Sequence, residues 1–237
     1  HQSRTAGLVG THLTRGFRRL AAELLPDEGR SASPLWTLLD DLPPVMLVRN
    51  YARLRGGYQP PWVAEGAAPK ADVCAGWRSD GTLVQGSLRA GRQLVTIGPP
   101  APHLADVDVS SLPPGGVRRH RRLDVAPGPE LLVLNAFFRD THTEADGRET
   151  VIHEYAARAH VDARTLRVLD ATADPHVLPY VECPTAAASA GRIAGRHLTA
   201  LRDEVRAEFT GIGTCTHLND LLRSFADAIG LLGRRHP

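Results

Sequence analysis

The stretch Leu132-Val-Leu-Asn-Ala-Phe-Phe138 decides the fold class of this 237-residue chain. Side chains of a β-strand alternate between two faces, and here every second residue is apolar: Leu132, Leu134, Ala136 and Phe138. Residues 151–161 repeat the pattern on the face that carries Tyr155. A period of two is typical of antiparallel strands that are buried on one side. Residues 117–171 are therefore predicted to form an antiparallel β-meander.

Two amphipathic segments follow the meander and are predicted to be helices. Residues 195–209 and 217–231 each place apolar side chains on one stripe at helical spacing. Thr216 stands directly before the second segment and is the expected N-cap. We expect both helices to pack on the apolar face of the sheet. The chain is thus predicted to be an α+β protein, in which two C-terminal helices pack on an antiparallel sheet.

The first part of the chain is predicted to be an N-terminal helical segment with small strands. Helices are expected at residues 6–25 and 35–42, and Pro43 and Pro44 are expected to end the second one. Residues 46–54 fit either a strand or a helix. Short strands separated by turn residues are expected at 72–77, 82–88 and 92–98.

A loop rich in proline and glycine, residues 99–116, is the best candidate for a boundary. It divides the chain into residues 1–98 and a core at residues 117–232. Both parts are expected to belong to the same domain.

Composition restricts the classes of partner. The formal net charge is +2 and aromatic residues make up 5% of the chain, so no nucleic-acid surface is expected. The densest arginine cluster, Arg118–Arg122, is expected to be a solvated strand face. Three cysteines do not indicate a disulfide framework, and neither a secretory signal nor a bilayer-spanning apolar run is expected. We therefore expect a cytoplasmic protein with no nucleic-acid partner and no membrane partner, and the oligomeric state stays open.

The segment Gly211–Arg223 contains the residues best suited to chemistry. Cys215 and His217 stand at the start of the last predicted helix, separated by one residue. Thiolates and imidazoles are zinc ligands, and a helix N-terminus stabilises a thiolate. A metal site or a nucleophile would explain this pattern. A buried cysteine followed by a helix-capping histidine would explain it equally well.

Three ionisable residues are predicted to point toward the buried side of the sheet. His153 lies on the apolar face of its strand, and Asp140 continues the apolar parity of residues 132–138. Asp170 continues the parity of Val168 in the last strand. Burying such groups is costly unless they are paired or coordinated. They either form a site or, in the case of the two aspartates, lie at strand ends in water.

Six short motifs occur in order along the core: Arg119–Asp124, Phe138–Thr141, Ile152–Glu154, Val168–Thr172, Pro179–Pro184 and Gly213–Leu218. Together they resemble the DUF2889 family, a bacterial family without an assigned function. In that family the last motif reads Gly-Cys-Thr-His-Leu, and Thr214 stands here in place of the glycine. The resemblance covers residues 117–232. It implies small-molecule metabolism of acyl or aromatic compounds and no particular reaction.

The favoured interpretation is a zinc site held by Cys183, Cys215, His217 and His153. Asp140, Glu154 or Asp170 would act as the catalytic base or support the ligands. An open coordination position would suit a metal-assisted hydrolase or lyase that acts on a small carbonyl-containing metabolite.

Two alternatives remain open. In the first, no metal is present and Cys215 is a nucleophile, its thiol pKa lowered by the helix N-terminus and His217. Asp140 or Glu154 would then orient a base. In the second, the protein is a non-catalytic binding module, and His153 and Cys215 line a small-molecule pocket.

Overall fold

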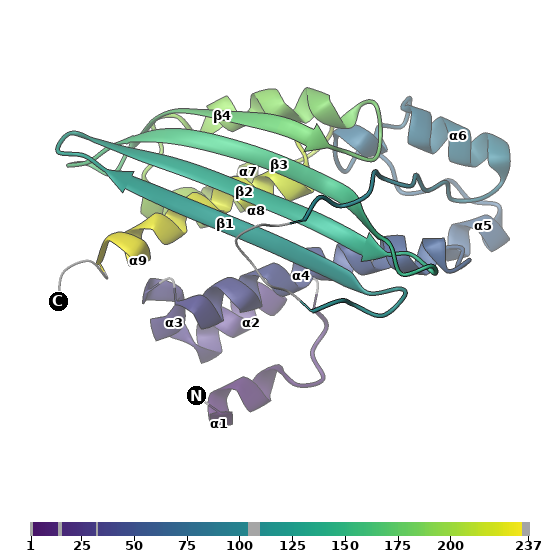
Figure 1. The fold of residues 1–237 in the computed structure, drawn as a ribbon, viewed down its shortest axis with the longest axis horizontal. Helices are drawn as coiled ribbons and strands as arrows, with labels where there is room; N and C mark the ends of the chain where they lie inside the picture. The colour runs from purple at the N-terminus through teal and green to yellow at the C-terminus, as the bar shows by residue number, and fades with distance from the viewer. Residues whose placement is uncertain (1, 14–15, 32, 104–109, 234–237) are drawn as a thin grey trace.

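A four-stranded antiparallel sheet forms the centre of the computed structural model, which describes residues 2–13, 16–31, 33–103 and 110–233 (Figure 1). Neighbouring strands follow one another in sequence, in the order β1-β2-β3-β4. Their bounds are β1 (Val117–Pro127), β2 (Leu131–Thr143), β3 (Glu149–Asp162) and β4 (Val168–Val177). The predicted β-meander is therefore confirmed.

C-terminal helices cover one face of this sheet (Figure 1). They are the 3-10 helices η3 (Cys183–Ile193), η4 (Leu198–Ala200) and η5 (Phe225–Asp227) and the α-helices α7 (Leu201–Glu208), α8 (Thr216–Ser224) and α9 (Ala228–Gly233). Phe138 and Tyr155 of the sheet share one core with Leu218, Leu222 and Phe225 of the helices. The predicted α+β class and the packing of the last helices on the apolar face are confirmed.

The start of α8 differs from the prediction. The helix begins at Thr216, so the N-cap position belongs to Cys215, whose backbone is extended (φ −131°, ψ 128°). The side chain of Cys215 makes no capping hydrogen bond. The predicted helix at residues 217–231 is divided by the tighter turn η5. The predicted helix at 195–209 is regular only from Leu201, after the 3-10 turn η4.

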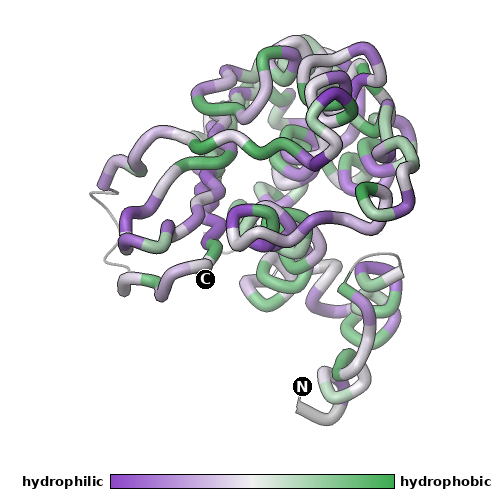
Figure 2. The backbone as a smooth tube through the Cα atoms, turned by 90° about the vertical axis from the view of Figure 1, so that its right-hand side faces the viewer, coloured by the Kyte–Doolittle hydropathy of each residue, from purple (hydrophilic) through white to green (hydrophobic). Residues whose placement is uncertain are grey.

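Helices of 3 to 22 residues make up the N-terminal part, whose first helix projects from the rest of the molecule (Figures 1 and 2). Their bounds are α1 (Gln2–Thr5), η1 (Ala6–Leu8), α2 (Phe17–Leu24), α3 (Pro26–Ser31), α4 (Pro34–Arg55), α5 (Pro61–Glu65), η2 (Ala75–Trp77) and α6 (Thr82–Ala90). The single helix predicted at 6–25 is interrupted, because Gly10 and Gly16 adopt left-handed backbone angles. None of the helices in the described ranges is both long and apolar enough to cross a membrane.

Helix α4 continues through Pro43 and Pro44, where the sequence predicted its end. Ser33 caps its start, with its Oγ accepting from the amide of Trp36 at 3.1 Å. A proline at position 44 cannot donate to the carbonyl of Asp40, four residues earlier. Arg18 of α2 donates to that carbonyl instead, from Nε at 3.1 Å and Nη2 at 2.8 Å. A partner distant in sequence thus satisfies the carbonyl that the proline leaves unbonded.

The strands predicted at 72–77, 82–88 and 92–98 are wrong. Residues 82–90 form α6, which buries Leu83, Val84 and Ser87 at helical spacing. Glu182 holds its first turn, accepting from the amide of Thr82 at 2.6 Å. The segment that follows α6 runs beside the start of β3, where the carbonyl of Pro99 accepts from the amide of Val151 at 2.9 Å and Pro100 bridges to Thr150.

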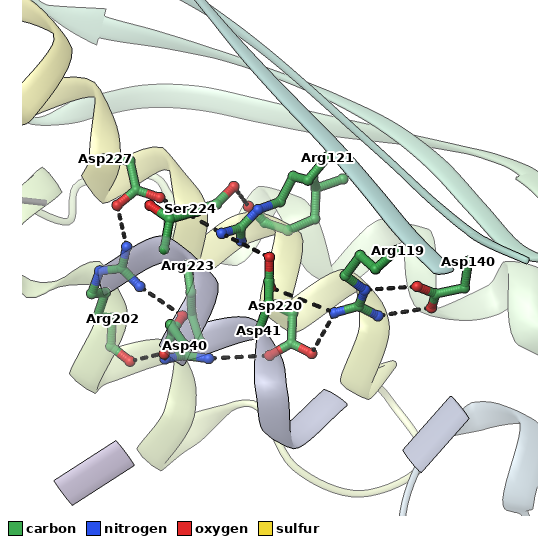
Figure 3. A network of polar contacts seen from close by, with 12 residues as sticks. Asp40, Asp41, Arg119, Arg121, Asp140, Arg202, Asp220, Arg223, Ser224 and Asp227 are labelled. Atoms are coloured by element: carbon green, nitrogen blue, oxygen red, sulfur yellow. Dashed lines mark hydrogen bonds and ion pairs between the residues drawn. The ribbon is translucent and has the colours of Figure 1, made fainter. Parts of the chain in front are cut away.

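A buried network of aspartates and arginines joins the helices to the sheet (Figure 3). Its carboxylates are Asp40, Asp41, Asp140, Asp220 and Asp227, and its guanidinium groups are Arg18, Arg119, Arg121, Arg202 and Arg223. Burying an ion is costly unless an opposite charge compensates it. Equal numbers of the two charges make this network neutral, and this balance is what allows it to lie inside the protein.

The expected solvated face at Arg118–Arg122 is wrong for two of its members. The side chains of Arg119 and Arg121 are 4% and 9% exposed and point into the network. The strand alternation explains the difference, because residues 119 and 121 share the helix-covered face of β1. Arg122, on the opposite face, is largely exposed.

Asp40 pairs with three arginines of the network, Arg18, Arg202 and Arg223, so its replacement tests the network. Asp40→Asn removes one of the two carboxylates that compensate Arg202 and one of the two that compensate Arg223, and both guanidinium groups are largely hidden from water. We expect the free energy of unfolding in urea to fall by about 3 kcal/mol or more. The matched control is Asp80→Asn, which removes an exposed pair with Arg78 and should cost less than about 1 kcal/mol. Equal losses in the two variants would contradict a structural role for the network.

Acid should destabilise the fold through the same carboxylates. Burial alone would raise the pKa values of Asp40 and Asp140, but the neighbouring arginines hold both well below the ordinary range. Their stabilisation is therefore complete above the unfolded pKa of about 3.9 and is lost as the pH falls toward the lower folded values. Burial raises the pKa of Asp41 and opposes this trend in part. Urea unfolding from about pH 6 to about pH 3 should show a smaller loss in Asp40→Asn than in the natural protein.

Candidate metal centre

Asp140, His153 and His217 come together on the buried face of the sheet. Each offers one ligand atom, and these atoms all lie within 4.8 Å of one another. Asp140 of β2 is the register partner of His153 of β3, and a β-bulge follows directly after this pair. His217 enters from the first turn of α8. Within the described residues, this is the group of three or more acidic, histidine or cysteine side chains with metal-binding spacing.

Asp140 is fully buried, and Arg119 fixes its orientation. The guanidinium donates two hydrogen bonds of 2.7 Å, from Nε to Oδ1 and from Nη2 to Oδ2 (Figure 3). Burial by itself would raise the pKa of Asp140, but the charge and hydrogen bonds of Arg119 hold it well below the usual range. The carboxylate is therefore ionised at neutral pH and can accept a further donor or a cation.

The two imidazoles stack on each other. Their ring centroids are 3.7 Å apart and the rings are inclined by 22°. Burial and the neighbouring His153 lower the pKa of His217 well below its ordinary value, so His217 is neutral at pH 7. Nδ1 of His153 is 3.4 Å from Oδ2 of Asp140, a long contact that does not satisfy hydrogen-bond geometry. Nδ1 of His153 and Nε2 of His217 are thus buried without a hydrogen-bond partner among the described residues.

The cysteines form a separate group around the phenol of Tyr155. Burial raises the pKa of Cys215 to about 11 and that of Cys183 to about 12. Burial raises the pKa of the Tyr155 hydroxyl, and the neighbouring thiols of Cys215, Cys183 and Cys74 raise it further. A Cβ atom added at Gly76 would collide with Sγ of Cys183, so the backbone of η2 packs directly on this thiol. Neither Cys183 nor Cys215 belongs to the group of ligand atoms around His153 and His217.

Glu154 and Asp170, the other predicted catalytic residues, lie away from this group. Glu154 follows His153 and points to the opposite face, where it accepts from Arg139 and contacts His176 at 3.0 Å. Asp170 was expected on the buried face, but it is exposed and lies 2.9 Å from Nδ1 of His160. A register shift beside His160 places an extra residue in β4 and turns Asp170 outward.

Arg119 is the site residue that the sequence reasoning missed. It contacts Asp140 directly, and its Nη1 lies 3.5 Å from Asp220 and 3.8 Å from Asp41. The only available signal was its strand parity, which places it on the face that the helices cover. Its register partner across the β1–β2 pair is Asp140.

One family model matches the core of the chain. Residues 117–230 match a family model described as a protein of unknown function, DUF2889. The resemblance seen in the sequence motifs is therefore confirmed for this segment. The DUF2889 segment contains all four strands and every residue of the candidate metal centre. No curated protein and no solved structure matches the chain.

Burial of Cys215 predicts slow alkylation. A thiol pKa of about 11 leaves a much smaller thiolate fraction at neutral pH than a free cysteine has. We expect iodoacetamide to label Cys215 at least about 100-fold more slowly than a free cysteine in the folded protein, as followed by peptide mass spectrometry. Cys74, the least buried of the three, should react first. All three should react alike in denaturant, and rapid native labelling of Cys215 would favour the nucleophile alternative.

Proposed function

We propose that Asp140, His153 and His217 bind a divalent metal ion, zinc in the first instance, and that the protein is a metal-assisted hydrolase or lyase. Its substrate would be a small carbonyl-containing metabolite. The observation that carries the proposal is the pair of buried imidazole nitrogens without hydrogen-bond partners, within 4.8 Å of an ionised carboxylate. Buried polar atoms without a hydrogen-bond partner are rare because they cost free energy, and metal coordination satisfies imidazole nitrogens of this kind.

The donor set suits such an ion. Two imidazoles and one carboxylate are ligands that zinc and other divalent transition metals accept, and three protein ligands leave a coordination position open. Both oxygens of Asp140 are bonded to Arg119, but a carboxylate has about four lone-pair sites and retains room for a metal. The two rings are stacked with their centroids 3.7 Å apart, so both imidazoles are close enough to serve one ion.

The chain's own residues orient and balance this centre. Arg119 holds the carboxylate of Asp140 in one position, as partners of metal ligands commonly do. Asp220 and Asp41 lie beside Arg119 and keep its charge compensated. The low pKa of His217 keeps its nitrogen unprotonated and available as a ligand. A bound divalent metal would polarise a carbonyl group or lower the pKa of a bound water.

Because the pKa of Cys215 is raised, we favour the metal site over a metal-free mechanism in which Cys215 is the nucleophile. A thiol with a pKa of about 11 stays protonated at neutral pH, and nucleophilic attack requires the thiolate. Glu154 and Asp170, on the far face of the sheet, are not within reach of the imidazole pair. Asp140 is therefore the one predicted carboxylate that we retain in the site.

Zinc binding tests the centre. Untagged protein, stripped with a chelator, should bind about one equivalent of zinc in calorimetry and elemental analysis. We expect His153→Gln and His217→Gln each to weaken zinc binding about 100-fold or more, because each removes one of three ligands. His160→Gln is the matched control, since His160 contacts an aspartate but lies on the other face. Cys215→Ser should leave zinc content unchanged, because the thiol lies outside the ligand group.

The catalytic part of the proposal needs a second measurement. Hydrolysis of p-nitrophenyl acetate, a small activated carbonyl compound, should depend on added zinc and disappear in His217→Gln. Retention of zinc with no metal-dependent hydrolysis of this ester or of related thioesters would favour the non-catalytic binding module. Unchanged zinc affinity in the double variant His153→Gln/His217→Gln would refute the centre itself.

A further inference from the structure

A cleft of about 1080 Å³ lies between the N-terminal helices and the C-terminal helices, and the metal-centre residues do not line it. Its wall combines two kinds of side chain. Guanidinium groups come from Arg18, Arg19, Arg202, Arg206 and Arg223, and apolar groups come from Ala22, Pro26, Trp36, Ala226 and Ile229. Pockets for small molecules commonly pair an apolar body with a few polar groups that fix orientation.

The acidic group inside the cleft is already fully engaged. The carboxylate of Asp40 accepts from Arg202 at 2.7 Å and from Arg223 at 2.8 Å (Figure 3). Its main-chain carbonyl accepts from Arg18. Asp203, the other acidic residue of the wall, pairs with Arg206 at the surface. The arginines of the wall are themselves paired with carboxylates, but five guanidinium groups line the cleft against two carboxylates, and each guanidinium carries five N–H donors. The wall therefore has more donors than its own carboxylates accept, which favours an anion over a cation.

The arginines also crowd one another. Burial and the positive charge of Arg223 lower the pKa of Arg18, and the carboxylates of Asp220 and Asp40 offset this only in part. Arg18, Arg206 and Arg223 additionally line a neighbouring cavity of about 360 Å³, so they stand between two hollows. An oxyanion placed at this boundary would face several guanidinium groups at once, and arginine forks match carboxylate and phosphate oxygens.

Trp36 gives the cleft an aromatic wall and a spare donor. Its side chain is largely buried, and it lines the cleft beside Gly29, where a Cβ atom added to the glycine would be in van der Waals contact with the ring. The indole Nε1 is buried without a hydrogen-bond partner among the described residues. An indole N–H usually finds an acceptor when it is buried.

We propose that this cleft binds a small organic anion, with a carboxylate or phosphate head group at Arg18 and Arg206 and an apolar body against Trp36. The inference goes beyond the metal centre and does not rest on it, because the two sites share no residue. It is therefore tested in protein stripped of metal with a chelator.

Trp36 supplies the readout. A ¹H–¹⁵N spectrum shows the indole signals of Trp36, Trp62 and Trp77, and the last two residues do not line the cleft. Millimolar hexanoate or hexyl phosphate should shift the Trp36 signal in a saturable way and leave those of Trp62 and Trp77 in place. Hexanamide, which has the same apolar body without charge, should have no comparable effect. Comparing the Kd of hexanoate with that of hexyl phosphate shows which head group the cleft prefers.

Arg206 is the residue to replace, because it is half exposed and its loss should not disturb the fold. We expect Arg206→Ala to raise the Kd for the preferred anion about tenfold, since it removes one charge-assisted hydrogen bond. Arg148→Ala is the matched control: Arg148 is an exposed arginine that pairs with a nearby aspartate at 2.7 Å but lies outside the cleft. It should leave the Kd unchanged.

Three results would overturn the proposal. The first is an absence of a saturable Trp36 shift with both anions. The second is equal binding of hexanamide and the anions, or of inorganic phosphate and hexyl phosphate, which would mean that the head group or the apolar body is not recognised. The third is an identical Kd in Arg206→Ala and Arg148→Ala.

Discussion

Arg119 and Asp140 form an ion pair on the face of the sheet that the helices cover, where both side chains are almost completely hidden from water. An unpaired charge in such a position costs several kcal/mol, so neither residue is tolerated there without the other. Arg119 also reaches Asp41 of α4 and Asp220 of α8. One interaction thus ties two helices to two strands, and it sets the position of His217, one turn before Asp220.

Single-residue irregularities in the strands decide which polar side chains join this pair. The β2–β3 register is regular up to Asp140 and His153 and shifts immediately after them. Both side chains therefore keep the parity of the apolar positions and face α8. The shift in the β3–β4 pair, beside His160, has the opposite effect on Asp170 and turns it to the outer face. The two strand residues of the candidate site, Asp140 and His153, are thus those that no register shift turns away from the helix-covered face.

The same distinction explains what the sequence could predict. The meander and α8 follow from local apolar periodicity, and Asp140 and His153 were found by counting along a regular strand. The course of α4 through Pro44 depends on Arg18, which lies 26 residues away and bonds the freed carbonyl of Asp40. The Cys183 and Cys215 thiols were chosen as ligands for their chemistry, but packing around Tyr155 separates them from the imidazoles. No local pattern encodes such long-range pairings.

The buried network connects the two proposed sites, and its own charges balance without a ligand at either of them. Arg119 contacts Asp220, Asp220 contacts Arg223, and Arg223 contacts Asp40 at the cleft. Because charges alternate along this path and cancel, neither site needs a ligand at the other to balance it. A cation beside Asp140 and an anion beside Arg18 would still attract each other through a medium less polar than water. Any coupling that follows from this attraction is reciprocal, so each ligand would strengthen the binding of the other.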